Sequence, residues 1–202
     1  MKVVLFGGFL GSGKTSLVMQ AARHISADVA YRSSGDKPPA VVIIENEIGE
    51  VALDAGFLAT GGYEVRNLFA GCICCTLAGN LLECFDEIVA SERPDWLLIE
   101  ATGMAYPEKI AEALRRYRGI SPRVLTVVDA KRWPDLFEAL EPLIVGQIRG
   151  ADAILVNKTD GLFPAALVAL RTTLTDLFPA KPVVSLSALD IVAPEIWRQL
   201  LP

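Results

Sequence analysis

The sequence predicts an α/β protein, a three-layer sandwich in which a mainly parallel sheet is covered by helices on both faces. Short apolar runs, often β-branched, recur along the 202-residue chain, and segments of helical length lie between them. Runs that are apolar throughout are typical of strands buried on both faces. Strands that alternate with helices are joined by right-handed crossovers into a parallel sheet.

Six runs are expected to be strands: 3–6, 41–44, 96–99, 124–128, 153–156 and 183–186. Helices are expected between them at 15–27, 77–91, 107–118, 132–149 and 164–178. Pro107 and Pro164 stand where a first-turn proline is tolerated. The loop at 31–39 and the segment from Glu45 to about Phe69 are expected to be irregular, and a long irregular segment in a compact domain often carries function.

Composition narrows the class of protein. The net charge is −5 and no long basic block is present, which argues against nucleic acid as a partner. No apolar run reaches the roughly eighteen residues of a membrane span, and no signal peptide precedes the first strand. We therefore expect one cytoplasmic domain over residues 1–202, whose four cysteines are thiols for metal or redox chemistry rather than disulfides.

A phosphate-binding loop follows the first strand. The segment GFLGSGKT at 8–15 is a complete Walker A pattern between a predicted strand and a predicted helix. Its small residues let backbone N–H groups turn inward around phosphate oxygens at a helix N-terminus: Gly8, Gly11, Ser12 and Gly13. We expect Lys14 to reach the β- and γ-phosphates and the Thr15 hydroxyl to ligate Mg²⁺.

The end of the strand expected at 96–99 offers a second possible ligand for Mg²⁺. Glu100 follows the run at 96–99 and can hold Mg²⁺ through water. Three positions later, Gly103 lets a backbone N–H approach a γ-phosphate. This pair is expected to sense which nucleotide is bound.

The strand at 153–156 is followed by Asn157, Lys158 and Asp160, which form an N-K-x-D motif. An aspartate there can accept hydrogen bonds from N1–H and the 2-amino group of guanine, which adenine cannot match. Ser187 and Ala188 follow the next strand and can present backbone groups to the guanine carbonyl. Together with the Walker A loop, these residues predict GTP rather than ATP.

Three cysteines lie within four residues: Cys72, Cys74 and Cys75. Three thiolates suit Zn²⁺ or another thiophilic metal, and tetrahedral zinc needs one more ligand, which can be Glu47, water or a group from a second chain. A redox switch and simple packing are the competing interpretations. Cys84, nine residues further on, is expected to be a core residue.

These motifs make the chain resemble the CobW/UreG/HypB family of P-loop GTPases, most closely its CobW-like branch. The resemblance rests on GGFLGSGKTS, NEIGEVALD, GCICCTLAGNL, LLIEATGMAYP, VVDA, QIRGADAILVNKTD and SAL. It implies a P-loop fold and a metallochaperone or metal insertase that couples GTP binding and slow hydrolysis to metal delivery. Its partner would be a client metalloenzyme or a corrinoid-pathway protein.

The resemblance also implies roles for individual residues. The phosphate loop corresponds to Gly11–Ser16, the Walker B acid to Glu100, and the switch segment's acidic positions to Glu47 and Asp54, which are candidates for orienting water. The metal-binding thiols and the guanine motif correspond to residues named above: Cys72, Cys74, Cys75, Asn157, Lys158 and Asp160. The C-terminal domain usual in CobW-like proteins is expected to be absent from 1–202. The histidine-rich tract of nickel-delivering relatives is missing, since His24 is the one histidine.

The sequence thus favours a GTPase switch in which Mg·GTP draws segment 45–70 toward the γ-phosphate and moves the cysteines that follow it. No arginine finger or water-positioning glutamine can be assigned, so we expect slow turnover. Two alternatives stay open, a small-molecule kinase on the same scaffold and a thiol redox sensor with structural GTP. Pairing of two copies around the nucleotide also stays open.

Overall fold

A computed structural model describes residues 1–28, 40–45, 63–67 and 77–202. The described strands form one parallel sheet in the order β3-β2-β4-β1-β5-β6-β7. Their bounds are β1 Lys2–Gly8, β2 Val41–Glu45, β3 Tyr63–Asn67, β4 Trp96–Glu100, β5 Arg123–Asp129, β6 Ala153–Asn157 and β7 Val183–Ser185. The α/β fold class expected from the sequence is confirmed.

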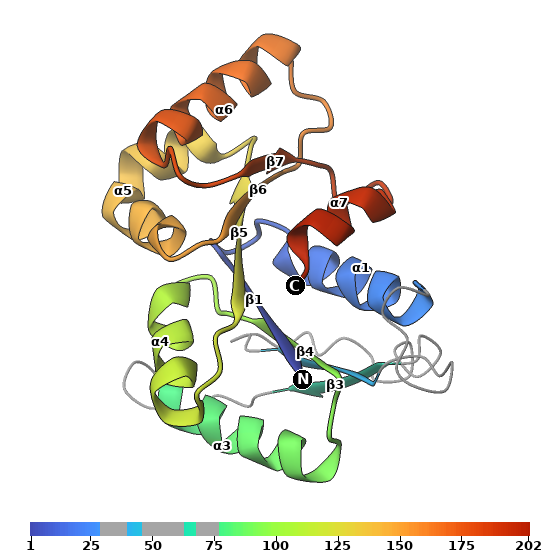
Figure 1. The fold of residues 1–202 in the computed structure, drawn as a ribbon. Coiled ribbons are helices and arrows are strands. Elements are labelled where there is room, and N and C mark those ends of the chain that lie inside the picture. The colour runs from blue at the N-terminus through green and yellow to red at the C-terminus, as the bar shows by residue number, and fades with distance from the viewer. Residues whose placement is uncertain (29–39, 46–62, 68–76) are drawn as a thin grey trace.

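Helices cover both faces of this sheet (Figure 1). Helices α1 (Lys14–Ala27) and α7 (Pro194–Leu200) lie on one face. The opposite face carries α3 (Leu77–Ser91), α4 (Pro107–Arg118), α5 (Trp133–Arg149) and α6 (Pro164–Leu177). Within the described ranges, none of these helices combines the length and the apolar character that crossing a bilayer requires.

The central strands are apolar throughout because both of their faces are packed. On β1, Val4 and Phe6 belong to the core beneath α1 and α7, whereas Val3 and Leu5 belong to the core beneath α3 and α4. All four side chains are buried. Side chains on both faces of such a strand are buried when the chain folds, and for this reason an uninterrupted apolar run predicts a central strand.

Two elements were not expected. The expectation that the segment from Glu45 to Phe69 is irregular is wrong at 63–67, where YEVRN forms β3 at the edge of the sheet and pairs with β2. An edge strand does not need an apolar run, so the pattern that identifies central strands misses it. Helix α7 has seven residues, which is too short for a helical periodicity to stand out.

The register of the sheet brings several polar strand ends to one edge. Phe6 of β1 pairs with Glu100, the last residue of β4. Asp129 of β5 pairs with Asn157 of β6 at the same edge. In open parallel sheets ligands bind outside the carboxyl ends of the strands, where the connections diverge to either side. The loop after β1 lies at this position.

Candidate nucleotide site

The loop between β1 and α1 depends on glycine at three positions. Gly8, Gly11 and Gly13 have φ angles of 131°, 72° and 93°, in a region that side-chain-bearing residues rarely adopt. A Cβ on Gly8 would lie 2.2 Å from the Val127 carbonyl oxygen, and one on Gly13 would lie 2.3 Å from Nδ2 of Asn157. The loop is therefore wound tightly against β5 and β6, and Gly13 is the N-cap of α1.

The carbonyl groups of this loop are held by side chains from around it. Four successive carbonyl oxygens each accept a hydrogen bond: Phe9 from Lys14 Nζ at 3.3 Å, Leu10 from Arg132 Nη1 at 3.3 Å, Gly11 from Lys158 Nζ at 2.6 Å and Ser12 from Asn157 Nδ2 at 2.8 Å. A trans peptide carries its N–H opposite its C=O, so each bound carbonyl fixes the direction of the N–H that follows it. The Ser12 N–H turns back to the Phe9 carbonyl at 3.2 Å. Backbone N–H groups at a helix N-terminus suit phosphate oxygens.

On the metal side, the Thr15 hydroxyl donates to Oε1 of Glu100 at 2.9 Å. Glu100 is only 3% exposed and Lys14 only 5%, so a carboxylate and an ammonium group are both held away from water beside the loop. A hydroxyl and a carboxylate are the oxygen ligands that Mg²⁺ takes in P-loop proteins. Thr15 and Glu100 are the described residues that could hold the ion. Ser16, the next residue of α1, is exposed.

Gly103 lies directly against the phosphate-binding loop. A Cβ at Gly103 would lie 2.6 Å from the backbone nitrogen of Leu10 and 2.7 Å from its Cα, so a larger residue would push the two backbones apart. Gln147 of α5 holds this segment, because its Nε2 donates to the carbonyls of Gly103 at 2.8 Å and Ala105 at 3.1 Å. The backbone that follows Glu100 is thus fixed against the loop between β1 and α1.

Asn157 is bonded both to the loop between β1 and α1 and to the segment that follows β7. Its amide is 1% exposed, donates to the Ser12 carbonyl, and accepts from the backbone N–H of Ala188 at 2.8 Å. Lys158 has a left-handed φ of 63°, and its ammonium group bonds the Gly11 carbonyl and pairs with Asp129 at 2.7 Å. The residues expected to read the base are therefore bonded directly to the loop expected to hold the phosphates.

Asp160 lies in a polar environment at the other end of the site. Its Oδ2 accepts from Lys131 Nζ at 2.6 Å and its Oδ1 from the Ser187 hydroxyl at 2.8 Å. The hydrogen bond from Lys131, followed by that from Ser187, holds the pKa of this carboxyl below its usual value of 3.8. Since a carboxylate offers about four acceptor positions, an ionised Asp160 keeps capacity for the donors of a guanine ring.

Ser187 and Ala188 were expected to present backbone groups to the guanine carbonyl. In the structure, the Ser187 hydroxyl donates a hydrogen bond to Asp160, and the Ala188 N–H donates one to the side chain of Asn157. The described contacts of both residues are therefore with members of the N-K-x-D segment, Asp160 and Asn157.

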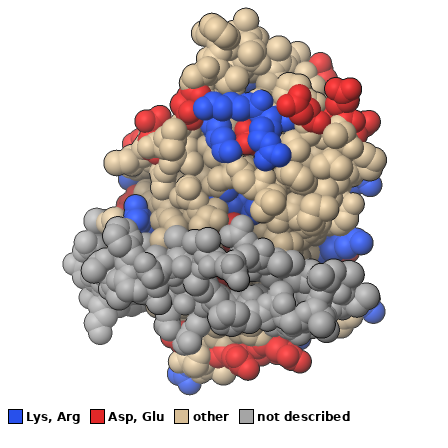
Figure 2. All heavy atoms as spheres, turned by 180° about the vertical axis from the view of Figure 1, so that it is seen from behind, with Lys and Arg blue, Asp and Glu red and all other residues tan. Residues whose placement is uncertain are grey.

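Figure 2 shows, on the face opposite to that of Figure 1, a group of basic side chains bordered by acidic ones. Charges of both signs alternate at short range in the site, where Asp129 pairs with Lys158 and Asp160 pairs with Lys131. The buried charge of Asp129 is compensated by this ion pair and by two backbone N–H donors.

Five residues singled out in the sequence lie outside the described ranges: Glu47, Asp54, Cys72, Cys74 and Cys75. Within those ranges, no three histidine, cysteine or acidic side chains gather as a metal site would require. Cys84 packs, partly buried, against the core beneath α3 and α4, where the sequence placed it.

Four residues that contact the candidate site were not predicted from the sequence: Asp129, Lys131, Arg132 and Gln147. The VVDA segment that ends β5 was the available signal for Asp129. Gln147 lies inside a predicted helix with no pattern around it, and only its burial and its bonds to the segment at 103–105 reveal its role.

The sheet is parallel and has a Walker A loop at its carboxyl edge. A strand-end acid is bonded to the loop threonine, and an N-K-x-D segment is bonded to the same loop. These features define a P-loop nucleotide-binding domain. A family model described as CobW/HypB/UreG, nucleotide-binding domain, matches residues 2–185. The chain belongs to this family, as the sequence motifs implied.

Curated relatives agree with this assignment. The zinc chaperone YeiR of Escherichia coli is 30% identical over 83% of this chain and 49% of its own length. The zinc chaperone YjiA of the same species is 33% identical over 78% of this chain and 49% of its own length. The zinc-regulated GTPase metalloprotein activator 1 of Schizosaccharomyces pombe is 29% identical over 85% and 42%. The chain therefore spans about half the length of these relatives.

Solved structures show the same fold. Zinc-bound YjiA GTPase from Escherichia coli superposes with a TM-score of 0.60 at 27% identity, covering 91% of this chain and 56% of that one. HypB from Archaeoglobus fulgidus gives a TM-score of 0.69 at 17% identity, covering 98% and 87%.

Proposed function

We propose that this chain binds and hydrolyses GTP with Mg²⁺ and couples its nucleotide state to zinc or another transition metal held by Cys72, Cys74 and Cys75, for delivery to a client metalloprotein. The observation that carries the nucleotide half is the bonding of Asn157 and Lys158 to the Ser12 and Gly11 carbonyls. A base read at one end therefore acts on the loop that holds the phosphates.

The chemistry of hydrolysis divides among the described residues. Backbone N–H groups of the loop and the charge of Lys14, which lies beside the Phe9 carbonyl, would compensate negative charge on the β- and γ-phosphates. Thr15 and Glu100 would hold Mg²⁺, which would supply positive charge against the negative charge that develops on the phosphates. Glu47 and Asp54 remain the proposed groups for orienting the attacking water.

Guanine selectivity would come from Asp160. Guanine offers N1–H and an amino group to this carboxylate, and adenine would leave it without those donors. We expect GTP to bind about a thousandfold more tightly than ATP, measured by calorimetry with Mg²⁺. Replacing Asp160 by Asn exchanges one acceptor for a donor, which no longer suits the guanine amino group and instead suits the 2-carbonyl of xanthine.

The Asp160→Asn variant should therefore bind GTP more weakly and XTP more tightly. Its melting temperature should change little, because the ion pair that it loses with Lys131 is exposed to water. If Asp160→Asn retained its preference for GTP, or if the wild-type chain bound ATP as tightly as GTP, the nucleotide assignment would be refuted.

The metal half is supported by relatives described as zinc chaperones and by the cysteine motif of this chain. Three thiolates with one exchangeable fourth ligand suit a site that passes its metal on. Under reducing conditions we expect one zinc per chain by native mass spectrometry, none when Cys72, Cys74 and Cys75 are all serine, and one again in the matched Cys84→Ser variant. Unchanged zinc content in the triple variant would overturn the assignment.

A further inference from the structure

Arg132 is the donor to the phosphate-binding loop that no sequence motif explains. Its Nη1 lies 3.3 Å from the Leu10 carbonyl oxygen, next in line after the carbonyl held by Lys14 and before those held by Lys158 and Asn157. We propose that Arg132 is a positioning residue for GTP, which holds the Leu10–Gly11 peptide so that the Gly11 N–H faces the phosphates. This inference rests on the proposed GTP-binding function.

The turn after β5 places Arg132 from a buried anchor. Asp129 is 3% exposed, and its Oδ1 accepts the backbone N–H groups of Lys131 at 3.0 Å and Arg132 at 3.2 Å. Its Oδ2 pairs with Lys158 at 2.7 Å, and Lys158 holds the Gly11 carbonyl. One carboxylate therefore fixes both the backbone of Arg132 and the lysine that holds the next carbonyl of the loop.

The side chain of Arg132 then lies across the loop. Its guanidinium carbon is 5.9 Å from the centre of the Phe9 ring, within the range of a cation–π contact. The ring on one side and the Leu10 carbonyl on the other give an exposed, otherwise flexible side chain a defined position.

The peptide that Arg132 contacts is one whose orientation has to be maintained. Gly11 has a φ of 72° and no Cβ, so rotation of the Leu10–Gly11 peptide meets little steric resistance. Rotation would turn the Leu10 oxygen, rather than the Gly11 N–H, toward the phosphates, where its partial negative charge repels them. A guanidinium on that oxygen favours the productive orientation, because a hydrogen bond to a charged donor is stronger than a neutral one.

The location of this peptide indicates which nucleotide depends on it most. The backbone of Leu10 is the part of the loop against which Gly103 packs. Gly103 belongs to the segment that follows the strand-end acid Glu100, the segment expected to meet a terminal phosphate. Loss of the Arg132 contact is therefore expected to weaken binding of the triphosphate more than binding of GDP.

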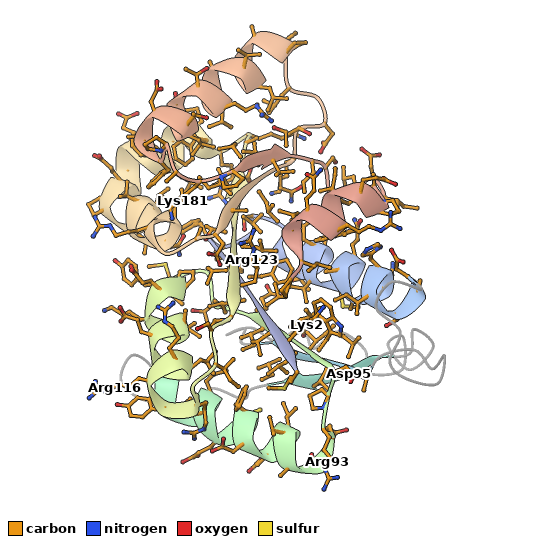
Figure 3. The ribbon with its side chains drawn as sticks, viewed as in Figure 1. Lys2, Arg93, Asp95, Arg116, Arg123 and Lys181 are labelled. Atoms are coloured by element: carbon orange, nitrogen blue, oxygen red, sulfur yellow. The ribbon has the colours of Figure 1, made fainter. Side chains whose placement is uncertain are left out.

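The test compares Arg132→Gln and Arg132→Lys with a matched control, Arg116→Gln. Arg116 is also an exposed arginine over an aromatic ring, 5.4 Å from Tyr117, but it projects outward from α4 (Figure 3). Its replacement changes the net charge by the same amount. Affinities for a non-hydrolysable GTP analogue and for GDP are measured by calorimetry with Mg²⁺, and melting temperatures are measured without nucleotide.

For Arg132→Gln we expect about a tenfold loss of affinity for the GTP analogue, as for one charge-assisted hydrogen bond, a smaller loss for GDP, and an unchanged melting temperature. Arg132→Lys keeps a charged donor and should recover part of the loss. The loss should persist at 0.5 M salt, where charges are screened beyond about 4 Å. Arg116→Gln should match the wild type.

Equal affinities for Arg132→Gln and Arg116→Gln, in a wild-type chain that binds GTP, would overturn the role of Arg132 alone. Equal losses for GDP and the GTP analogue together with a lower melting temperature would overturn it as well, because they would indicate a merely structural residue. A wild-type chain that binds no GTP would overturn both the proposed function and this inference.

Discussion

Replacing Asn157 by Ala tests the connection between the base end and the phosphate end of the site. The amide is 1% exposed and makes two hydrogen bonds of 2.8 Å, to the Ser12 carbonyl and from the Ala188 N–H. Truncation leaves both backbone groups without this partner, at about 1 to 3 kcal/mol for each group left unsatisfied. We expect a total loss of about 2 to 6 kcal/mol in the free energy of unfolding.

For a domain of this size, such a loss lowers the melting temperature by about 4 to 24 °C. GDP affinity should fall as well, because Asn157 no longer holds the Ser12 carbonyl of the phosphate loop. The matched control is Thr159→Ala, which removes a single hydrogen bond of 3.0 Å to the Leu186 carbonyl and no bond to the phosphate loop. It should cost about 1 kcal/mol.

Thermal melts with and without GDP, together with calorimetric GDP titrations, provide the comparison. The reasoning is refuted if Asn157→Ala melts within about 2 °C of Thr159→Ala, a difference worth less than about 1 kcal/mol, and binds GDP as the wild type does.

Three further predictions concern the same domain. Gly103→Ala places a Cβ 2.6 Å from the Leu10 nitrogen. In calorimetric titrations it should weaken binding of a GTP analogue more than binding of GDP. Equal losses of affinity for the two nucleotides would count against the proposed contact with a terminal phosphate. Thr15→Val removes the hydroxyl bonded to Glu100 and should abolish the Mg²⁺ dependence of nucleotide affinity. A Mg²⁺ titration of nucleotide binding measures this dependence, and an unchanged dependence would contradict the prediction. Burial lowers the pKa of His24 below its usual 6.5, so the unfolded chain takes up a proton before the folded chain does as the pH falls. The free energy of unfolding should therefore decrease as the pH drops below 6.5. Denaturant unfolding at two pH values should show a smaller decrease in His24→Gln than in the wild type, and an identical decrease would contradict the assignment.

The sheet was predictable because its central strands are buried on both faces, so that the apolar runs at 3–6 and 153–156 carry a clear signal. Strand β3 was not predictable in this way, since YEVRN is an edge strand that mixes charged and apolar residues. The positions of Gly11, Asn157 and Asp160 followed from motifs in which the residue type and spacing are dictated by the ligand.

Residues that act on the site from other elements were beyond the reach of motifs. Gln147 contacts Gly103 across more than forty residues of sequence, and Arg132 reaches Leu10 across more than a hundred. Nothing near either side chain in the sequence distinguishes it from a surface amide or a surface cation. Only the fold shows that one is buried and that the other lies over the phosphate loop.

In the proposed function, nucleotide and metal affect each other's binding within this chain. The most direct test measures zinc affinity, by competition with a chromophoric chelator under reducing conditions, for the chain with a non-hydrolysable GTP analogue, with GDP and without nucleotide. We expect zinc affinity to differ between the GTP analogue and GDP, by about 5- to 150-fold as is typical of coupled sites. Zinc should change the ratio of the two nucleotide affinities by the same factor. An identical zinc affinity in all three states would contradict the proposed coupling.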